Sequence, residues 1–112
     1  MNPSMLTKKD WAGVPRRALT PTEIVTRLAN LPGWTLAGDG ADVAIEKTYD
    51  FADYHETMAF VNALAFIAHR ADHHPDLSVH YGKCVVRFST HSLKGLSETD
   101  FACAAAADAL LA

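Results

Sequence analysis

Cysteine is scarce in this sequence, with only Cys84 and Cys103 among 112 residues. The two lie far apart, without a C-x-x-C pair and without the Cys-His spacing of a zinc motif. A domain stabilised by disulfides would use more cysteines than this. The scarcity argues against a disulfide framework and predicts two reduced, half-buried thiols in a cytoplasmic protein.

Long apolar runs and a net positive charge are also missing. No run approaches the roughly 20 residues of a membrane span, and the first residues lack the apolar core of a secretory signal. Ten Lys and Arg residues stand against 13 Asp and Glu, for a formal charge of −3 with neutral histidines. Without an overall basic field, nucleic acid is not an expected partner, and neither is a membrane.

The length and composition that are present fit one small globular domain. A chain of 112 residues, 49% hydrophobic and 21% charged, is typical of a single soluble domain. Residues 1–18 are basic, lack a sustained period and contain Pro3, Gly13 and Pro15, so we predict a flexible leader there and the domain over 19–112. So short a chain buries a modest share of its surface, which favours self-association.

Hydrophobic periodicity predicts three helices and four strands. Thr20, Pro21 and Glu23 have the pattern of a capping box with proline at the first helical position, and Pro32-Gly33 ends that helix near Asn30. The period then predicts strands over 34–36 and 43–51, a helix over 53–70, strands over 77–81 and 84–91, and a helix over 101–112 after a cap-like start at 97–100. This order favours an α+β fold, a four-stranded antiparallel sheet with three helices packed on one face.

Histidine is the most unusual feature of the sequence. Five of the six histidines, namely His69, His73, His74, His80 and His91, fall within one short stretch, and the sixth is His55. The unperturbed pKa of histidine lies near neutrality, so the side chain can donate and accept protons at cellular pH. His73 and His74 follow a predicted helix and His91 ends a predicted strand, where side chains can converge over a cleft.

Two other interpretations of these histidines stay open from the residues alone. A histidine at the end of a helix is most often a capping or surface residue, although two in tandem before a proline are less easily explained in that way. Three histidines could also supply a catalytic zinc site, with carboxylates such as Asp72 and Asp76 nearby. Adjacent side chains tend to point apart, however, and H-E-x-x-H is absent. We therefore expect no metal and no organic cofactor.

Three motifs at fixed spacing give the sequence a family resemblance. They are Asp72-His73-His74-Pro75-Asp76, then Thr90-His91, then Gly95-Leu96-Ser97-Glu98-Thr99-Asp100. Tyr81, Lys83 and the segment Leu31-Pro32-Gly33-Trp34 match as well. With these motifs the chain resembles the pterin-4a-carbinolamine dehydratase family over about residues 19–110. HHP alone would be a weak signal, but its combination with the other two motifs is strong.

The resemblance implies a function and a set of site residues. Members dehydrate the 4a-hydroxytetrahydrobiopterin released by aromatic amino acid hydroxylases, giving quinonoid dihydropterin and water in tetrahydropterin recycling, and they form homodimers or homotetramers. By position, His73, His74 and His91 correspond to the catalytic histidines. The substrate-side positions implied by the motifs are Trp34, Asp72, Pro75, Asp76, Thr90 and Asp100. Trp34 could equally be a core anchor beside a turn.

Two departures and one rival function qualify the resemblance. His69 stands where a glutamate often occurs, which removes a candidate orienting carboxylate, and Leu77 replaces a common tryptophan, which alters the expected pocket wall. Some relatives act as dimerisation cofactors for a transcription factor, and others assist assembly of a carbon-fixing enzyme. The three matched histidines favour an active hydro-lyase here, and a non-catalytic binding role on the same fold is the alternative.

Overall fold

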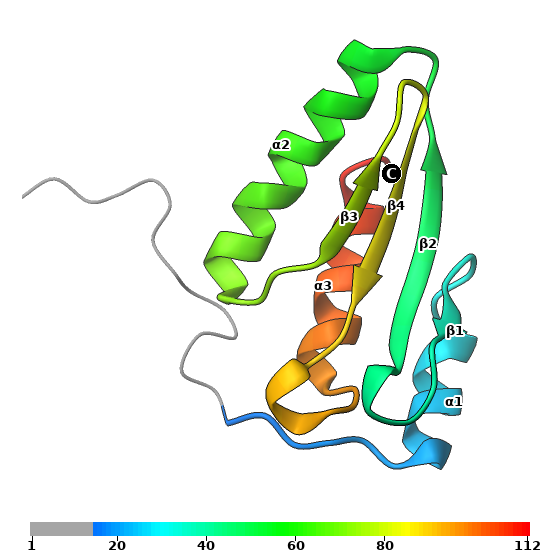
Figure 1. Cartoon of the computed structure of the whole chain (residues 1–112), viewed down its shortest axis with the longest axis vertical. Helices are drawn as coiled ribbons and strands as arrows, with labels where there is room; N and C mark the ends of the chain where they lie inside the picture. Colours follow the sequence, from blue (N-terminus) through cyan, green and yellow to red (C-terminus); the bar gives the residue numbers. More distant parts are fainter. Residues whose placement is uncertain (1–14) are drawn as a thin grey trace, which may run out of the picture.

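The computed structural model describes residues 15–112, which form three helices and one four-stranded sheet. In chain order the elements are α1 (Pro21–Ala29), β1 (Thr35–Ala37), η1 (Gly40–Asp42), β2 (Ala44–Asp50), α2 (Tyr54–Ala71), β3 (Asp76–Val79), β4 (Lys83–Phe88), η2 (His91–Leu93) and α3 (Glu98–Ala109), the two η elements being single 3₁₀ turns. The predicted α+β fold and element order are confirmed (Figure 1).

The sheet is antiparallel throughout, in the order β1-β2-β4-β3. Along β4, Cys84, Val86 and Phe88 are fully buried, while Val85 and Arg87 between them are only partly buried. This alternation is expected of a sheet with one covered face. The helices α2 and α3 cover that face (Figure 1), and Ile24 and Leu28 of α1 pack against the same core.

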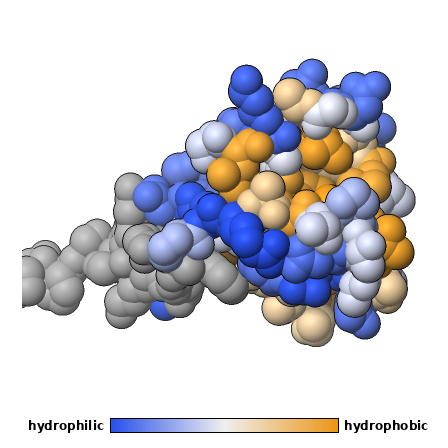
Figure 2. Space-filling model, turned by 90° about the horizontal axis from the view of Figure 1, so that it is seen from below, coloured by the Kyte–Doolittle hydropathy of each residue, from blue (hydrophilic) through white to orange (hydrophobic). Residues whose placement is uncertain are grey.

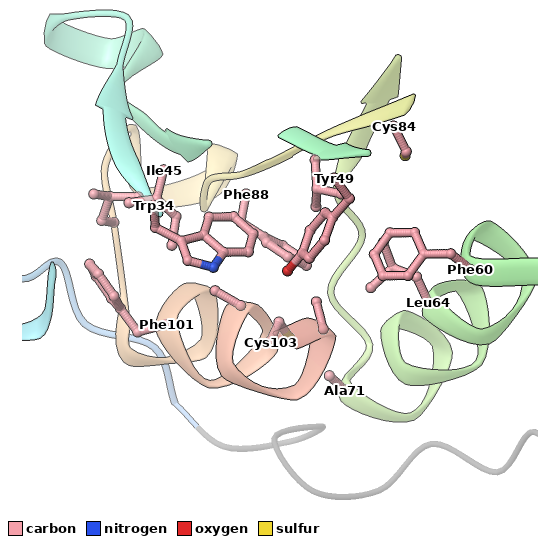
Figure 3. Packing of buried hydrophobic residues seen from close by; sticks show 14 of the residues in the cluster. Trp34, Ile45, Tyr49, Phe60, Leu64, Ala71, Cys84, Phe88, Phe101 and Cys103 are labelled. Atoms are coloured by element: carbon pink, nitrogen blue, oxygen red, sulfur yellow. The ribbon is translucent and has the colours of Figure 1, made fainter. Parts of the chain in front are cut away.

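Aromatic rings form the centre of the core between the sheet and the two longer helices. Trp34, Phe88, Tyr49 and Phe60 lie in a row there (Figure 3), with ring centroids 6.0 Å apart for Trp34 and Phe88 and 4.5 Å apart for Tyr49 and Phe60. Buried aromatic rings at such distances stabilise a core by area and by edge or offset contacts. The Tyr49–Phe60 contact also joins the sheet to α2.

The ends of several elements differ from the sequence prediction. The strand predicted over 84–91 ends at Phe88, because the chain then turns and the Thr90 N–H donates to the Gly95 carbonyl at 3.0 Å. The strand predicted over 77–81 is Asp76–Val79, and α3 starts at Glu98 because Ser97 caps it. The two 3₁₀ turns were not predicted. The shortened β4 matters most, since it releases Thr90 and His91 from the sheet.

Candidate functional site

The helix α2 ends in a turn that fixes the backbone of His73. Asp72 adopts the left-handed conformation, with φ 52° and ψ 46°. The Asp72 N–H donates to the His69 carbonyl at 3.1 Å, and the His73 N–H to the Ala68 carbonyl at 3.0 Å. These two bonds make a Schellman motif, in which glycine is the usual left-handed residue. Pro75 then prevents the helix from resuming, so His73 leaves α2 in a defined direction.

The side chain of His73 is buried against a carboxylate from α3. Its Nε2 lies 2.5 Å from Oδ1 of Asp100, and the two side chains are 7% and 0% exposed. The imidazole also stacks on Phe88, with ring centroids 6.2 Å apart and planes inclined by 12°. A carboxylate and an aromatic face together hold the ring in one orientation.

Two donors hold the other carboxylate oxygen of Asp100 in turn. Its Oδ2 accepts from the Ser97 backbone N–H at 2.9 Å and from the Thr90 hydroxyl at 2.8 Å, and the Thr90 and Ser97 hydroxyls lie 2.7 Å apart. Asp100 is the third residue of α3 and completes a capping box with Ser97. A carboxylate in the first turn of a helix is also favoured by the helix dipole. The same side chain thus starts α3 and binds His73.

This arrangement suits a proton-transfer residue. With Asp100 ionised, its Oδ1 accepts a hydrogen bond from Nε2–H of His73, which leaves Nδ1 as the second ring nitrogen. A carboxylate behind a histidine fixes the tautomer and stabilises the imidazolium, as in other acid-base sites. The geometry can therefore support a histidine that gives or takes a proton through Nδ1.

The other two predicted catalytic histidines lie on the flanking segments, and both are exposed. Asp76 pairs with Arg87, so β3 begins at the same end of the sheet at which β4 ends. His74 precedes β3 and His91 follows β4, on the segments whose neighbouring residues His73 and Thr90 both bind Asp100. Nε2 of His91 lies 3.5 Å from the Ser89 hydroxyl. The structure thus brings His73, Thr90 and Asp100 into contact, with His74 and His91 next to them in sequence.

The surface at this end of the molecule mixes polar and apolar character. Figure 2 views the end at which η2 and the segment before α1 lie in Figure 1. A band of hydrophilic residues crosses this face beside a group of hydrophobic ones (Figure 2). Of the predicted substrate-side residues, Pro75 is half-buried and Asp76 is exposed, while Asp72 caps α2.

Trp34 lies in the core instead, and is 4% exposed. Its indole packs on Phe88, and Nε1–H donates to both carboxylate oxygens of Asp108, at 3.2 and 3.1 Å. His73 also stacks on Phe88, so one phenylalanine ring links the tryptophan to the histidine. Trp34 serves as a core anchor in this structure, and its contact with a substrate stays a prediction.

Asp108 forms a second polar cluster near the other end of α3. Lys47 Nζ donates to its Oδ1 at 2.9 Å, and the Tyr49 hydroxyl donates to the same oxygen. Burial alone would raise the pKa of Asp108, but hydrogen bonds from Tyr49, Lys47 and Trp34 hold that pKa below its usual value. Burial, followed by the bond to Asp108, raises the pKa of Tyr49. This cluster has no histidine.

Sequence reasoning missed Phe88 and Arg16 as neighbours of the histidine. Phe88 falls within the strand predicted over 84–91, and nothing local shows that an imidazole stacks on it. Arg16 had been assigned to the leader, yet its guanidinium contacts the ends of α2 and α3. Ser97 had a signal, since the S-x-x-D spacing predicts a helix cap.

One cavity with a mainly apolar lining lies away from His73, His74 and His91. It has a volume of about 440 Å³ and is lined by Phe51, Glu56, Ala59, Phe60, Ala63, Leu110 and Leu111. These residues come from the segment before α2, from α2 as far as Ala63 and from the end of the chain, whereas His73 follows the last turn of α2. This groove has only Glu56 as a titratable lining residue.

Two features are absent from residues 15–112. No three or more His, Cys, Asp or Glu side chains of this range are grouped so that they could bind a metal ion. Within the same range no helix has the length and apolar character needed to cross a membrane.

The chain matches one protein family over most of its length. The family model described as pterin 4 alpha carbinolamine dehydratase matches residues 17–110. A protein of Paracidovorax citrulli is 72% identical over 109 residues, covering 97% of this chain and 94% of its own. One of Stenotrophomonas maltophilia is 54% identical over 101 residues, covering 87% and 85%. Both carry the name "Putative pterin-4-alpha-carbinolamine dehydratase".

Two solved structures share the fold. A protein titled transcriptional coactivator/pterin dehydratase, from Brucella melitensis, superposes with a TM-score of 0.80 at 29% identity, covering 86% of this chain and all of the other. A pterin dehydratase-like protein, titled a RuBisCO assembly factor in the alpha-carboxysome, gives a TM-score of 0.60 at 26% identity over 70% of this chain and 88% of its own. The family match over residues 17–110 and the two relatives above show that this chain belongs to the pterin 4 alpha carbinolamine dehydratase family.

Proposed function

We propose that the chain dehydrates 4a-hydroxytetrahydrobiopterin to quinonoid dihydropterin and water, as a hydro-lyase in tetrahydropterin recycling after an aromatic amino acid hydroxylase. The observation that carries this proposal is the buried pair of His73 and Asp100, with Nε2 and Oδ1 2.5 Å apart. The pair lies at the end of the sheet where the HHP and T-H motifs meet. A fixed imidazole beside exposed histidines is suited to an elimination that needs one proton donor and one acceptor.

The reaction breaks one C–O bond and one N–H bond of the substrate. A histidinium protonates the 4a-hydroxyl, so that the C4a–O bond breaks with water as the leaving group. A neutral histidine takes the N5 proton, and the electron pair of that N–H bond forms the C4a=N5 bond. His73 and His91 share these two roles, and the protons they exchange balance over one turnover.

The remaining site residues bind or position. His74 is exposed beside His73 and orients the pterin, with Asp72, Pro75, Asp76, Thr90 and Trp34 as the other substrate-side candidates. Asp100 is fully buried, so we assign it a positioning role behind His73 and no direct contact with the pterin. No metal or organic cofactor takes part in this scheme.

The test is dehydration of freshly generated 4a-hydroxytetrahydropterin, followed by ultraviolet absorbance. We expect the wild-type protein to accelerate the reaction clearly over the uncatalysed rate, and to lose none of this rate after treatment with a chelator. A wild-type rate equal to the uncatalysed one would refute the enzymatic proposal. Stoichiometric zinc with chelator-sensitive turnover would replace the scheme by a metal-dependent one.

Histidine variants assign the roles. His73→Ala and His91→Ala should each lower kcat by roughly 10²–10⁴-fold, the usual contribution of general acid-base help. His74→Ala should raise KM more than it lowers kcat. His55→Ala is a matched control, since His55 lies in the first turn of α2, far along the helix from His73. Unchanged kinetics in all three site variants would show that the cluster is structural.

A binding or assembly role is the second candidate, because one structural relative is called a transcriptional coactivator/pterin dehydratase and the other a RuBisCO assembly factor. A protein of this kind would bind a partner without turning over the carbinolamine. The dehydration assay separates the two, because an assembly factor would show the uncatalysed rate and the same partner binding in His73→Ala as in wild type.

We further propose a homodimer or homotetramer in the cytoplasm. In the described part of the chain β3 pairs with β4 alone, and Leu77 and Val79 on it are 37% and 39% exposed. An open strand edge with exposed apolar side chains favours pairing with another chain. Light scattering after gel filtration would give the mass, and a monomer at micromolar concentration would contradict this assignment.

A further inference from the structure

Arg16 connects the two elements that carry the histidine and its carboxylate. It lies in residues 15–18, which have no regular structure, and it precedes the segment matched by the family model. One guanidinium nitrogen donates to the carbonyls of Ala71 and Asp72, at 3.0 and 3.2 Å, and Nε donates to the Thr99 hydroxyl at 3.3 Å. A single side chain therefore bonds the end of α2 and the first turn of α3.

Both ends of this connection adjoin the His73–Asp100 pair. Asp72 is the residue directly before His73, and Thr99 is the residue directly before Asp100. The last carbonyls of a helix have no partner within it, and a cation there is also favoured by the helix dipole. Arg16 donates to the carbonyls of Ala71 and of the left-handed Asp72.

Neighbouring contacts hold residues 15–18 in place. The Leu19 N–H donates to the Leu96 carbonyl at 2.8 Å, and the Leu19 side chain is buried in the core. A cavity of about 140 Å³ remains between residues 15–19 and residues 97–99, lined in part by Arg16 and Arg17. Arg16 is thus held by its hydrogen bonds more than by close packing.

We propose that Arg16 is a positioning residue for the catalytic pair, fixing the backbone before His73 relative to the helix turn that presents Asp100. The proposal rests on the proposed function. Arginine suits the task because its planar guanidinium offers donors in a fixed fork, whereas a lysine ammonium is one flexible point charge. Displacing a catalytic group by about 1 Å can cost roughly 10²-fold in rate.

The experiment compares Arg16→Met and Arg16→Lys with Arg17→Met. Arg17 is a matched control, since it lines the same cavity but its side chain bonds Glu23 and the Ala18 carbonyl, and its side chain is 64% exposed. The first measurement is a long-range ¹H–¹⁵N spectrum of the His73 ring in the substrate-free protein. We expect shifted or broadened His73 signals in both Arg16 variants and unchanged signals in Arg17→Met.

The second measurement is kinetic. Arg16→Met should lower kcat by about 10–10²-fold with KM within about twofold, and Arg16→Lys should restore at most part of that loss. Thr99→Val removes only the acceptor on α3 and should shift the His73 signals in the same direction. It serves as the variant to use if Arg16→Met does not fold.

Two outcomes would overturn the proposal. One is a His73 ring spectrum of the Arg16 and Thr99 variants that superposes on that of wild type. The other is an equal loss of kcat in Arg17→Met, which would indicate a general effect of charge. The spectrum needs no turnover, so a protein without dehydratase activity would defeat the proposed function while the positioning of His73 by Arg16 is still decided.

Discussion

The two ends of α3 each carry an aspartate that accepts several hydrogen bonds, yet they hold different kinds of donor. Asp100, in the first turn, binds His73, the Thr90 hydroxyl and the Ser97 N–H. Asp108, in the last turn, binds the Trp34 indole, Lys47 and the Tyr49 hydroxyl. The Asp100 side chain is fully buried, whereas that of Asp108 is 27% exposed.

The difference shows what makes a carboxylate cluster suitable for proton transfer. An indole N–H does not titrate, and burial raises the pKa of Tyr49 further from neutrality. Lys47 and Asp108 form an ion pair. At the Asp100 end, by contrast, the carboxylate holds an imidazole, a side-chain type that can both donate and accept a proton. The Asp108 cluster therefore fixes α3 to the sheet, and the Asp100 cluster is the one able to do acid-base chemistry.

The largest expected effect is on activity, from Asp100→Asn. An amide in place of the carboxylate can impose the wrong tautomer on His73, and in other histidine–aspartate sites this costs up to about 10⁴-fold. We expect kcat to fall by roughly 10²–10⁴-fold in the dehydration assay. Asp108→Asn is the matched change at the other end of α3 and should leave kcat within about twofold.

Asp100 also caps α3, so stability must be measured beside activity. Loss of a helix cap costs about 1 kcal/mol of unfolding free energy, which a denaturant titration would detect. A loss of this size should leave the protein folded at the assay temperature. The ring spectrum of His73 separates the two effects, because a purely structural role would leave its nitrogen shifts unchanged. Equal kinetics in the two asparagine variants would remove the distinction between the two ends of α3.

A smaller effect, on stability, is expected from Asp108→Asn. Hydrogen bonds to a charged group contribute up to a few kcal/mol, so we expect a loss of about 1–3 kcal/mol in the free energy of unfolding at pH 7. Because the pKa of Asp108 is lowered in the folded protein, its ionised form stabilises the fold above the usual carboxyl pKa of about 4. That contribution is lost as the pH falls through the folded value.

The measurement is urea unfolding of wild type and Asp108→Asn between pH 7 and pH 3. The difference between them should be constant near neutrality and shrink on acidification. A difference that grows as the pH falls would mean that Asp108 is not held in its ionised form by these donors.

The fold was largely predictable from local patterns, and the errors of the prediction lie at the ends of the elements. Thr20 and Glu23 make the predicted capping box, with bonds of 3.2 and 2.9 Å, and the element order is the predicted one. The predicted end of β4 was wrong. The alternation of apolar and polar residues continues through Ser89, but the backbone of Thr90 already pairs with Gly95. Such a turn depends on a bond to a residue outside the strand.

The site was predictable only in part, for a different reason. The motifs identified His73, Thr90 and Asp100, and these three meet. The spacing of Ser97 and Asp100 predicts a helix cap, but not that the same carboxylate reaches a histidine 27 residues away. Arg16 has no local pattern, since its partners are two backbone carbonyls at the end of α2 and the Thr99 hydroxyl of α3. Contacts that depend on tertiary packing leave no period or spacing in the sequence.

The smallest expected effect comes from the exposed ion pair of Arg17 and Glu23 at the start of α1, 2.8 Å apart. Arg17, then the backbone of Thr20, lowers the pKa of Glu23 to about 2, so the ionised form stabilises the fold above the usual carboxyl pKa and this is lost as the pH falls through about 2. Exposed pairs contribute little because water and salt screen them, and in Glu23→Gln the amide can still accept the capping bond. We expect a smaller change in Tm than in Asp108→Asn at pH 7, decreasing further at high salt. The contradicting outcome is a loss of Tm in Glu23→Gln as large as that in Asp108→Asn, with no effect of salt. The anchoring of α1 would then depend on the charge of Glu23 itself. The contrast between buried and exposed carboxylate clusters would not hold.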